Sequence, residues 1–208
     1  MRKMVFLMIF TLLMVPSVFS QSEDDFDVGL TDDGKGVVIK KYIGTVLQVR
    51  IPATIQGIPV KEIGDNSFQE FETAFKKHMG ITSVEIPNGV IIIKRFAFYG
   101  CEKLSHVIIP ESVTIIEDSA FGICTSLRSI TLPSGLKQLG GGGVYGPFFH
   151  SGLTSITIPA DITVIRDGTF YKCENLERIV LPEGLITIGE DAFNCCTKLI
   201  IVNLPSTI

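Results

Sequence analysis

The chain has 208 residues, of which 46% are hydrophobic and 19% are charged, a balance that excludes intrinsic disorder. Its 18 Lys and Arg against 22 Asp and Glu give a formal net charge of −4, so no basic excess is available for a nucleic-acid backbone. Trp is absent and Phe is the main aromatic residue, while β-branched residues, Gly and Pro are frequent. This composition disfavours a helical bundle, and the length fits one domain or one short repeat array.

Residues 1–20 have the layout of a secretory signal peptide. Arg2 and Lys3 precede an apolar run over residues 4–15, Pro16 ends the run, and Ser20 lies at the expected cleavage point. The run is too short to cross a bilayer, which takes about 20 apolar residues. We therefore expect an exported chain that is secreted, on the cell surface or periplasmic, with no transmembrane segment after cleavage. An uncleaved N-terminal anchor is the alternative.

Prolines recur along the rest of the chain, and four of the six intervals between them are 23 residues long. Each proline ends a segment of the pattern apolar-x-x-apolar-x-apolar-Pro, such as LSHVIIP, LRSITLP, LTSITIP and LERIVLP. A recurring period of this length is typical of a solenoid, in which stacked coils share one continuous core. The positions are Pro52, Pro87, Pro110, Pro133, Pro159, Pro182 and Pro205.

The second half of each repeat carries a Phe, a Cys three residues later and a Leu three residues after that. We expect the repeated Phe to insert into the core as a large apolar wedge. The segment before each proline is rich in β-branched residues and so predicts a short strand in a parallel stack. The two series are Phe98, Phe121, Phe170 and Phe193, and Cys101, Cys124, Cys173 and Cys196.

These motifs closely resemble the BspA-like, treponemal-type family of bacterial leucine-rich repeats. The resemblance rests on the strand pattern, the Ile-Pro or Leu-Pro step, the Ala-Phe pair and the trailing Cys-x-x-Leu. It implies a mainly β repeat solenoid: a right-handed coil with a parallel β-sheet on its concave face and about seven strand repeats of 23-residue period. We expect residues 21–35 to form an N-terminal lead-in and residues 36–208 to form the repeat domain.

Three departures from the repeat are visible. Residues 70–80 form an insertion that follows Phe68, which takes the wedge position of its repeat. The repeat after Pro133 gains three residues, contains the run Gly140–Gly143 and lacks its cysteine, so that Phe148 is the expected wedge. The last repeat is truncated at Ile208, and no polar cap is visible there.

Five cysteines in an exported chain raise the question of disulfides. Stacked coils lie about 4.7–4.9 Å apart, which permits the pairs Cys101–Cys124 and Cys173–Cys196. The Cβ vectors would lie side by side, however, so we favour buried free thiols that pack as small apolar groups. Cys195 is a candidate for a bond between chains.

No arrangement of residues indicates catalysis, a metal site or a cofactor. His78, His106 and His150 lie in different coils without ligand partners at metal-binding spacing. No G-x-S-x-G motif is present, and the glycine run at Gly140 lacks the Lys-Ser/Thr of a phosphate-binding loop. The short acidic stretch Asp32-Asp33-Gly34 predicts a hairpin turn. We expect that this protein is not an enzyme.

The remaining candidate site is the outward side of the strands on the concave face. Its residues are mainly Ser and Thr with single apolar and charged side chains, which either form a protein-binding patch or simply fill strand positions. The candidate partner-binding residues are Arg50, Glu85, His106, Ile108, Thr131, Thr157, Arg178, Val180, Ile201 and Asn203.

The family resemblance implies adhesion or host interaction, with a host matrix protein or a bacterial surface protein as partner and no nucleic acid. The alternative is a structural role, in which the uncapped C-terminal coil stacks on a second copy of the chain to give a homo-oligomer.

Overall fold

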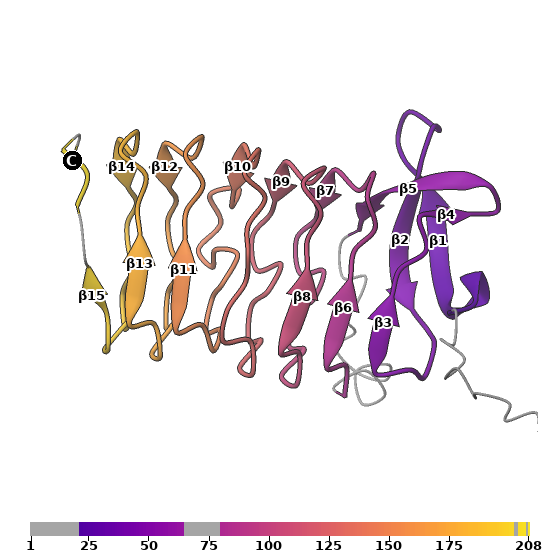
Figure 1. Ribbon diagram of the computed structural model, residues 1–208, viewed down its shortest axis with the longest axis horizontal. Helices are drawn as coiled ribbons and strands as arrows, with labels where there is room; N and C mark the ends of the chain where they lie inside the picture. Colours follow the sequence, from indigo (N-terminus) through magenta and orange to yellow (C-terminus); the bar gives the residue numbers. More distant parts are fainter. Residues whose placement is uncertain (1–20, 65–79, 202–203, 207) are drawn as a thin grey trace, which may run out of the picture.

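The structure is a computed structural model that describes residues 21–64, 80–201, 204–206 and 208. The predicted signal peptide, Phe68, most of the 70–80 insertion, His78 and Asn203 lie outside these residues. The described chain forms an elongated mainly β solenoid, with the N-terminal hairpin at one end and the C-terminal coil at the other (Figure 1). The predicted fold class is confirmed.

An antiparallel hairpin covers the N-terminal end of the solenoid. A single 3-10 turn, η1 (Glu23–Asp25), leads into β1 (Phe26–Leu30), which pairs with β2 (Val37–Tyr42) across the predicted turn at residues 32–34. Tyr42 is fully buried, and its hydroxyl donates to Val46 O at 3.0 Å and accepts from Val46 N at 3.1 Å. The hairpin therefore joins the core through its last strand. β4 (Thr54–Ile55) forms a second small hairpin with β5 (Ile58–Ile63).

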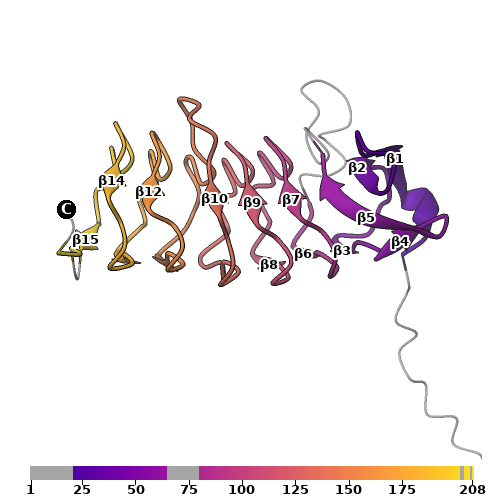
Figure 2. The ribbon, with the colours of Figure 1, turned by 90° about the horizontal axis from the view of Figure 1, so that it is seen from above.

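Two parallel ladders run along the solenoid. We call the first the strand face; its strands are β3 (Gln48–Arg50), β6 (Ser83–Glu85), β8 (His106–Ile108), β11 (Ser155–Thr157), β13 (Arg178–Val180) and β15 (Ile200–Ile201). The second ladder begins at β2 and β5 and continues through β7 (Ile92–Ile93), β9 (Ile115–Ile116) and β10 (Gln138–Leu139), then β12 (Val164–Ile165) and β14 (Thr187–Ile188). Figure 2 shows the two ladders on different sides of the solenoid.

The register follows the 23-residue period that the prolines predict. Ser83 pairs with His106, and Ser155 pairs with Arg178. The middle residue of these strands points inward: Val49 and Val84 are 2% exposed and Ile179 is 0% exposed. Because side chains alternate along a strand, the residues on either side of the middle one point outward and are free to vary.

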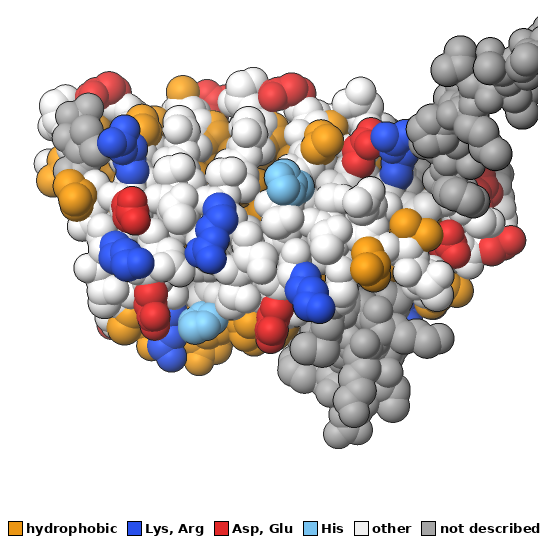
Figure 3. All heavy atoms as spheres, turned by 60° about the horizontal axis from the view of Figure 1, so that its bottom comes forward, with side chains coloured by type: hydrophobic (Ala, Val, Ile, Leu, Met, Phe, Trp, Pro, Cys, Tyr) orange, Lys and Arg blue, Asp and Glu red, His pale blue; other side chains and the backbone are white. Residues whose placement is uncertain are grey.

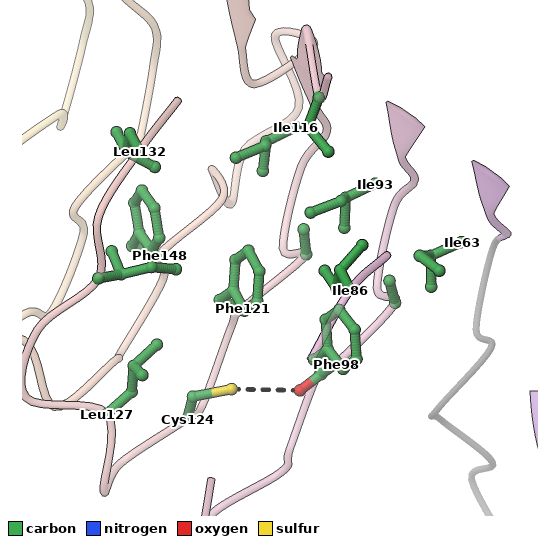
Figure 4. Packing of buried hydrophobic residues seen from close by; sticks show 14 of the residues in the cluster. Ile63, Ile86, Ile93, Phe98, Ile116, Phe121, Cys124, Leu127, Leu132 and Phe148 are labelled. Atoms are coloured by element: carbon green, nitrogen blue, oxygen red, sulfur yellow. Dashed lines mark hydrogen bonds between the residues drawn. The ribbon is translucent and has the colours of Figure 1, made fainter. Parts of the chain in front are cut away.

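A stack of phenylalanine rings forms the third side of the core. Phe98 and Phe121 lie 5.3 Å apart, Phe121 and Phe148 lie 5.9 Å apart, and Phe148 and Phe170 lie 5.6 Å apart, with interplanar angles of 10°, 12° and 9°. Phe193 continues the stack at 5.4 Å from Phe170. Phe148 is fully buried, so its predicted wedge role is confirmed (Figure 4).

Left-handed backbone residues flank each ring of this stack. Two residues after the ring, Ile123 has φ 57°, His150 has φ 50° and Lys172 has φ 61°. A side chain in this region costs roughly 1–2 kcal/mol, so something must hold it there. The N–H of Ile123 donates to Phe149 O, that of His150 to Tyr171 O and that of Lys172 to Asn194 O, at 2.8–2.9 Å. Hydrogen bonds between neighbouring coils therefore stabilise this strained turn.

Both ladders are interrupted at the same coil. Ser129–Thr131 occupies the strand-face position between β8 and β11 without forming a strand, and β10 does not pair with β12. Figures 1 and 2 show a wider space between β10 and β12 than between β9 and β10. This is the coil with the three-residue insertion, whose glycine loop bonds to Asp118 on the preceding coil through Gly141 N at 2.7 Å and Gly143 N at 2.9 Å. The extra residues follow β10, which still pairs with β9 in the regular register, and the phenylalanine stack stays continuous through this coil.

We expect Phe121→Ala to lower the free energy of unfolding by about 3–5 kcal/mol, because it removes a buried ring with a ring on each side. Urea unfolding monitored by circular dichroism measures the change. Val144→Ala is the matched control, since Val144 is 78% exposed and its loss should change stability by no more than about 0.5 kcal/mol. A loss below about 1 kcal/mol for Phe121→Ala would contradict the role of the stack.

Candidate functional site

The strand face gathers most of the predicted partner-binding residues on one side. The register aligns Arg50, Glu85 and Ile108 in one row of the ladder, and Thr157 with Val180 in the later part of the same row. His106 and Arg178 belong to the neighbouring row, and Thr131 lies at the interruption between β8 and β11. Glu85 is half-buried, and the other residues of this set are exposed.

The last repeat differs from the prediction. Arg178 pairs with Ile200, and Ile201 pairs with the inward-pointing Ile179, so Ile201 is not in the row of Arg178 as the proline spacing predicts. Residues 200–202 are Ile-Ile-Val. A strand with apolar residues at successive positions presents an apolar side chain inward in either register, and its register is therefore weakly specified. Ile200 takes the outward position and is 71% exposed.

Charge on the strand face is sparse. Arg50 Nε lies 2.7 Å from Glu85 Oε2, in an exposed pair that balances both charges. Arg178 has no carboxylate within ion-pair distance among the residues that the structure describes. His106 Nδ1 lies 2.8 Å from Ser105 Oγ. Figure 3 brings the turns below the strand face forward and shows Lys, Arg, Asp and Glu side chains interspersed, without a patch of one sign on the described surface in view.

Exposed apolar side chains stand among the Ser and Thr residues of this face. Ile108 is 62% exposed and Val180 is 47% exposed. Such residues surrounded by polar ones suit contact with another protein, because they gain from burial while the hydroxyl groups supply hydrogen bonds at the rim.

Several hollows open along the strand face. One, of about 590 Å³, lies at the interruption and is lined by residues 129–132, 134 and 155–160 together with Arg178 and Val180. Another, of about 400 Å³, lies over β3, β6 and β8, between the Arg50–Glu85 pair, His106 and Ile108. The hollow at the interruption was not predicted, because its position depends on the break in the ladder.

A second cluster not predicted from the sequence lies beside the phenylalanine stack. Tyr145 stacks on Phe149 at 4.3 Å and on Tyr171 at 6.1 Å, and Phe149 and Tyr171 lie 5.8 Å apart. Phe149 and Tyr171 directly follow the repeated Phe, a position that Tyr99 also occupies, so this periodicity was available in the sequence. Tyr145 comes from the inserted loop, and its stacking fastens that loop to the following coils.

The described residues contain no group of three or more His, Cys, Asp or Glu side chains that could hold a metal ion. Asp118 is buried and is engaged by the glycine loop and by Arg95 Nη2 at 3.5 Å, so it is a structural carboxylate. Among the described residues, no helix has the length and apolar character needed to cross a membrane.

The cysteine column is confirmed as free thiols. Cys101, Cys124 and Cys173 are buried, Cys196 is half-buried and Cys195 is exposed. Each column thiol after the first donates to the carbonyl of a repeated Phe on the preceding coil: Cys124 to Phe98, Cys173 to Phe148 and Cys196 to Phe170, at 3.0–3.2 Å. Burial raises the pKa of Cys101 and of Cys196 to about 12 and that of Cys173 to about 11. These thiols therefore stay protonated at neutral pH.

A solenoid of 23-residue coils, with short parallel strands on one face and repeated Phe, Cys and Leu positions inside, defines a leucine-rich-repeat protein. The family model described as "BspA type Leucine rich repeat region (6 copies)" matches residues 71–145 and 145–208. The chain belongs to this family.

Solved structures of similar bacterial proteins support this assignment. The T. pallidum leucine-rich-repeat protein TpLRR is 27% identical with a TM-score of 0.65, over 86% of this chain and 90% of that one. A leucine-rich-repeat protein from Bacteroides ovatus is 27% identical with a TM-score of 0.66, over 89% of this chain and 53% of its own length. A search of curated protein sequences gives no significant match.

We expect a disulfide-exchange reagent to label one thiol per chain in the folded protein and five after unfolding. Only Cys195 is exposed, and the buried thiols have raised pKa values, so the number labelled should stay at one from pH 7 to pH 9. Mass spectrometry gives the count, and Cys195→Ser should reduce it to zero. Labelling of two or more thiols before unfolding would contradict the buried column.

Proposed function

We propose that this protein is an exported bacterial protein, on the cell surface, secreted or periplasmic, that binds another protein through the strand face. Membership of a leucine-rich-repeat family supports a role in protein–protein interaction. The signal-peptide layout of residues 1–20 supports export. Adhesion to a host matrix protein or to a bacterial surface protein is the form of this role that we favour, and we assign no catalytic step to it.

The observation that carries the proposal is the alignment of variable side chains on an invariant scaffold. The inward residues of β3, β6, β11 and β13 are all Val or Ile, whereas the outward residues include Arg, Glu, His, Ile, Thr and Val. The outward side chains add nothing to the core, so their identity is free to suit a partner. Ile108 and Val180 supply apolar contact, and Arg178 supplies an unbalanced positive charge.

We expect Ile108→Asp and Arg178→Glu each to weaken partner binding at least tenfold, because central apolar and arginine contacts dominate protein interfaces. Surface plasmon resonance of the immobilised chain against purified extracellular-matrix proteins and bacterial surface proteins measures the effect. Ile186→Asp and Lys35→Glu are matched controls, since both positions are exposed and lie off the strand face.

The proposal fails if no protein in the panel binds the chain. It also fails if the control variants weaken binding as much as the strand-face variants do.

Self-assembly is a second candidate, favoured by the exposure of the last coil. Ile188, Phe193 and Leu199 are half-buried, whereas their counterparts Ile165, Phe170 and Leu176 are fully buried under the following coil. A second copy of the chain stacked on this coil would cover them. We expect light scattering over a hundredfold concentration range to show a rise in mass, and Phe193→Asp to prevent it. A constant monomer mass at the highest concentration would contradict this candidate.

A further inference from the structure

The interruption of the ladders leaves a slit between two coils, residues 128–139 and residues 154–165. It is closed at one end by Thr154 N donating to Arg128 O at 2.9 Å and at the other end by Gly146 N donating to Gly168 O at 3.1 Å. Between these ends, within the described residues, the side chains of the two coils are joined by the exposed ion pair of Lys137 with Asp161. The hollow of about 590 Å³ is the mouth of this slit on the strand face.

The edge of β11 that borders the slit has free backbone groups. Ile158 N donates to Val180 O at 2.9 Å, so residues 156 and 158 present their backbone groups to β13. In a parallel strand the backbone groups of successive residues point alternately to the two neighbours. Those of Ser155 and Thr157 therefore point into the slit, and no backbone hydrogen bond joins them to residues 128–132 in the described chain.

The opposite wall of the slit, residues 128–132, also has a backbone group without a ladder partner in the described chain. Where the ladder is intact, the residue after the strand donates to the next coil, as Ile86 N does to Ile108 O at 3.0 Å and Ile51 N to Glu85 O at 3.1 Å, whereas Ile109 after β8 makes no such bond within the described chain. Leu132 is the equivalent residue here, and it makes no such bond within the described chain. Leu132 is 7% exposed, against 2% for Ile51 and Ile86. Unpaired backbone groups beside a core are unfavourable. A partner that forms hydrogen bonds with them therefore gains binding free energy.

We propose that the slit takes up an extended peptide segment of a partner protein as an added β-strand. This inference rests on the proposed function, and it names the slit as the binding site and strand addition as the binding mode. The strands β11 and β13 are three residues long, so a segment of about that length matches the edge of β11. Its backbone pairs with Ser155 and Thr157, and its inward side chain packs against Ile130 and Ile156.

The lining of the slit sets the chemistry of the segment. Arg178 is the only charged residue that lines the mouth, and the other lining residues are apolar or hydroxyl side chains. A segment of β-branched residues with one acidic side chain is complementary to it. A basic segment is disfavoured, because it would place like charge beside Arg178.

A suitable probe is the fluorescein-labelled peptide ITSVEIP, the sequence of residues 81–87. Within the protein this strand pairs with β3 on one side and with β8 on the other, and it carries one acidic residue. We expect saturable binding to the purified chain by fluorescence anisotropy. N-methylation of the central valine of the peptide should weaken binding at least tenfold, because it removes a backbone donor and leaves every side chain in place.

Thr157→Pro tests the protein side of the same contact. It removes the N–H that points into the slit and leaves the ladder with β13 intact, so binding should fall at least tenfold. Thr157→Val keeps the N–H and removes only the side-chain hydroxyl, so it separates the backbone contact from the side-chain contact. A loss of binding as large as that of Thr157→Pro would overturn the added-strand proposal. A thermal-unfolding midpoint within a few degrees of the unmodified chain shows that the proline variant is folded.

Amide hydrogen exchange on the unmodified chain provides a test that needs no variant. The peptide should slow exchange at Ser155 and Thr157 at least tenfold and leave Gln48–Arg50 unchanged. Absence of this protection, or full binding by Thr157→Pro, overturns the slit proposal. If Ile108→Asp abolishes partner-protein binding while Thr157→Pro leaves it unchanged, the slit proposal falls and the broader function stands. If neither variant has an effect on a partner that binds, both fall.

Discussion

The continuous contact between coils is the stack of phenylalanine rings with its flanking left-handed turns. Rings from Phe98 to Phe193 lie 5.3–5.9 Å apart and nearly parallel. The turns after Phe121, Phe148 and Phe170 are strained, and their N–H groups bond to the next coil, so strain and cohesion are coupled at one position. The stack stays continuous at the coil where both strand ladders are interrupted. The alignment of the stack therefore does not require a continuous strand ladder.

The same coupling explains how the protein accommodates an irregular coil. The coil that carries the insertion has no strand at Ser129–Thr131, but it keeps Phe148 in the stack and adds Tyr145 to a second row of rings. Asp118 then fixes the glycine loop through two backbone bonds. The irregular coil is thus held by contacts on the side of the phenylalanine stack. On the strand face, within the described chain, its backbone groups lack ladder partners.

Much of this architecture is readable from residue spacing. The proline period gives the parallel register, the missing cysteine identifies the irregular coil, and Phe148 is recognisable as its wedge because every coil needs one. The interruption itself is not readable, since LRSITLP has the same pattern as strands that do form. Whether it pairs depends on its distance from the neighbouring coils, which no local pattern specifies. The predicted register of β15 is wrong for a related reason. The sequence Ile-Ile-Val places an apolar side chain inward in either alignment, so it does not select one.

The division between inward and outward residues also decides what the fold says about function. Inward positions are repeated because each coil must match the next, and they carry no information about a partner. Outward positions such as Arg178 and Ile108 carry that information, but each is compatible with the same scaffold. The slit differs from both, because there, among the described residues, the backbone groups of Ser155 and Thr157 have no ladder partner, and the added strand that we propose would pair with them. It is the part of the surface where the physics of the scaffold, rather than the choice of side chains, specifies the form of the ligand.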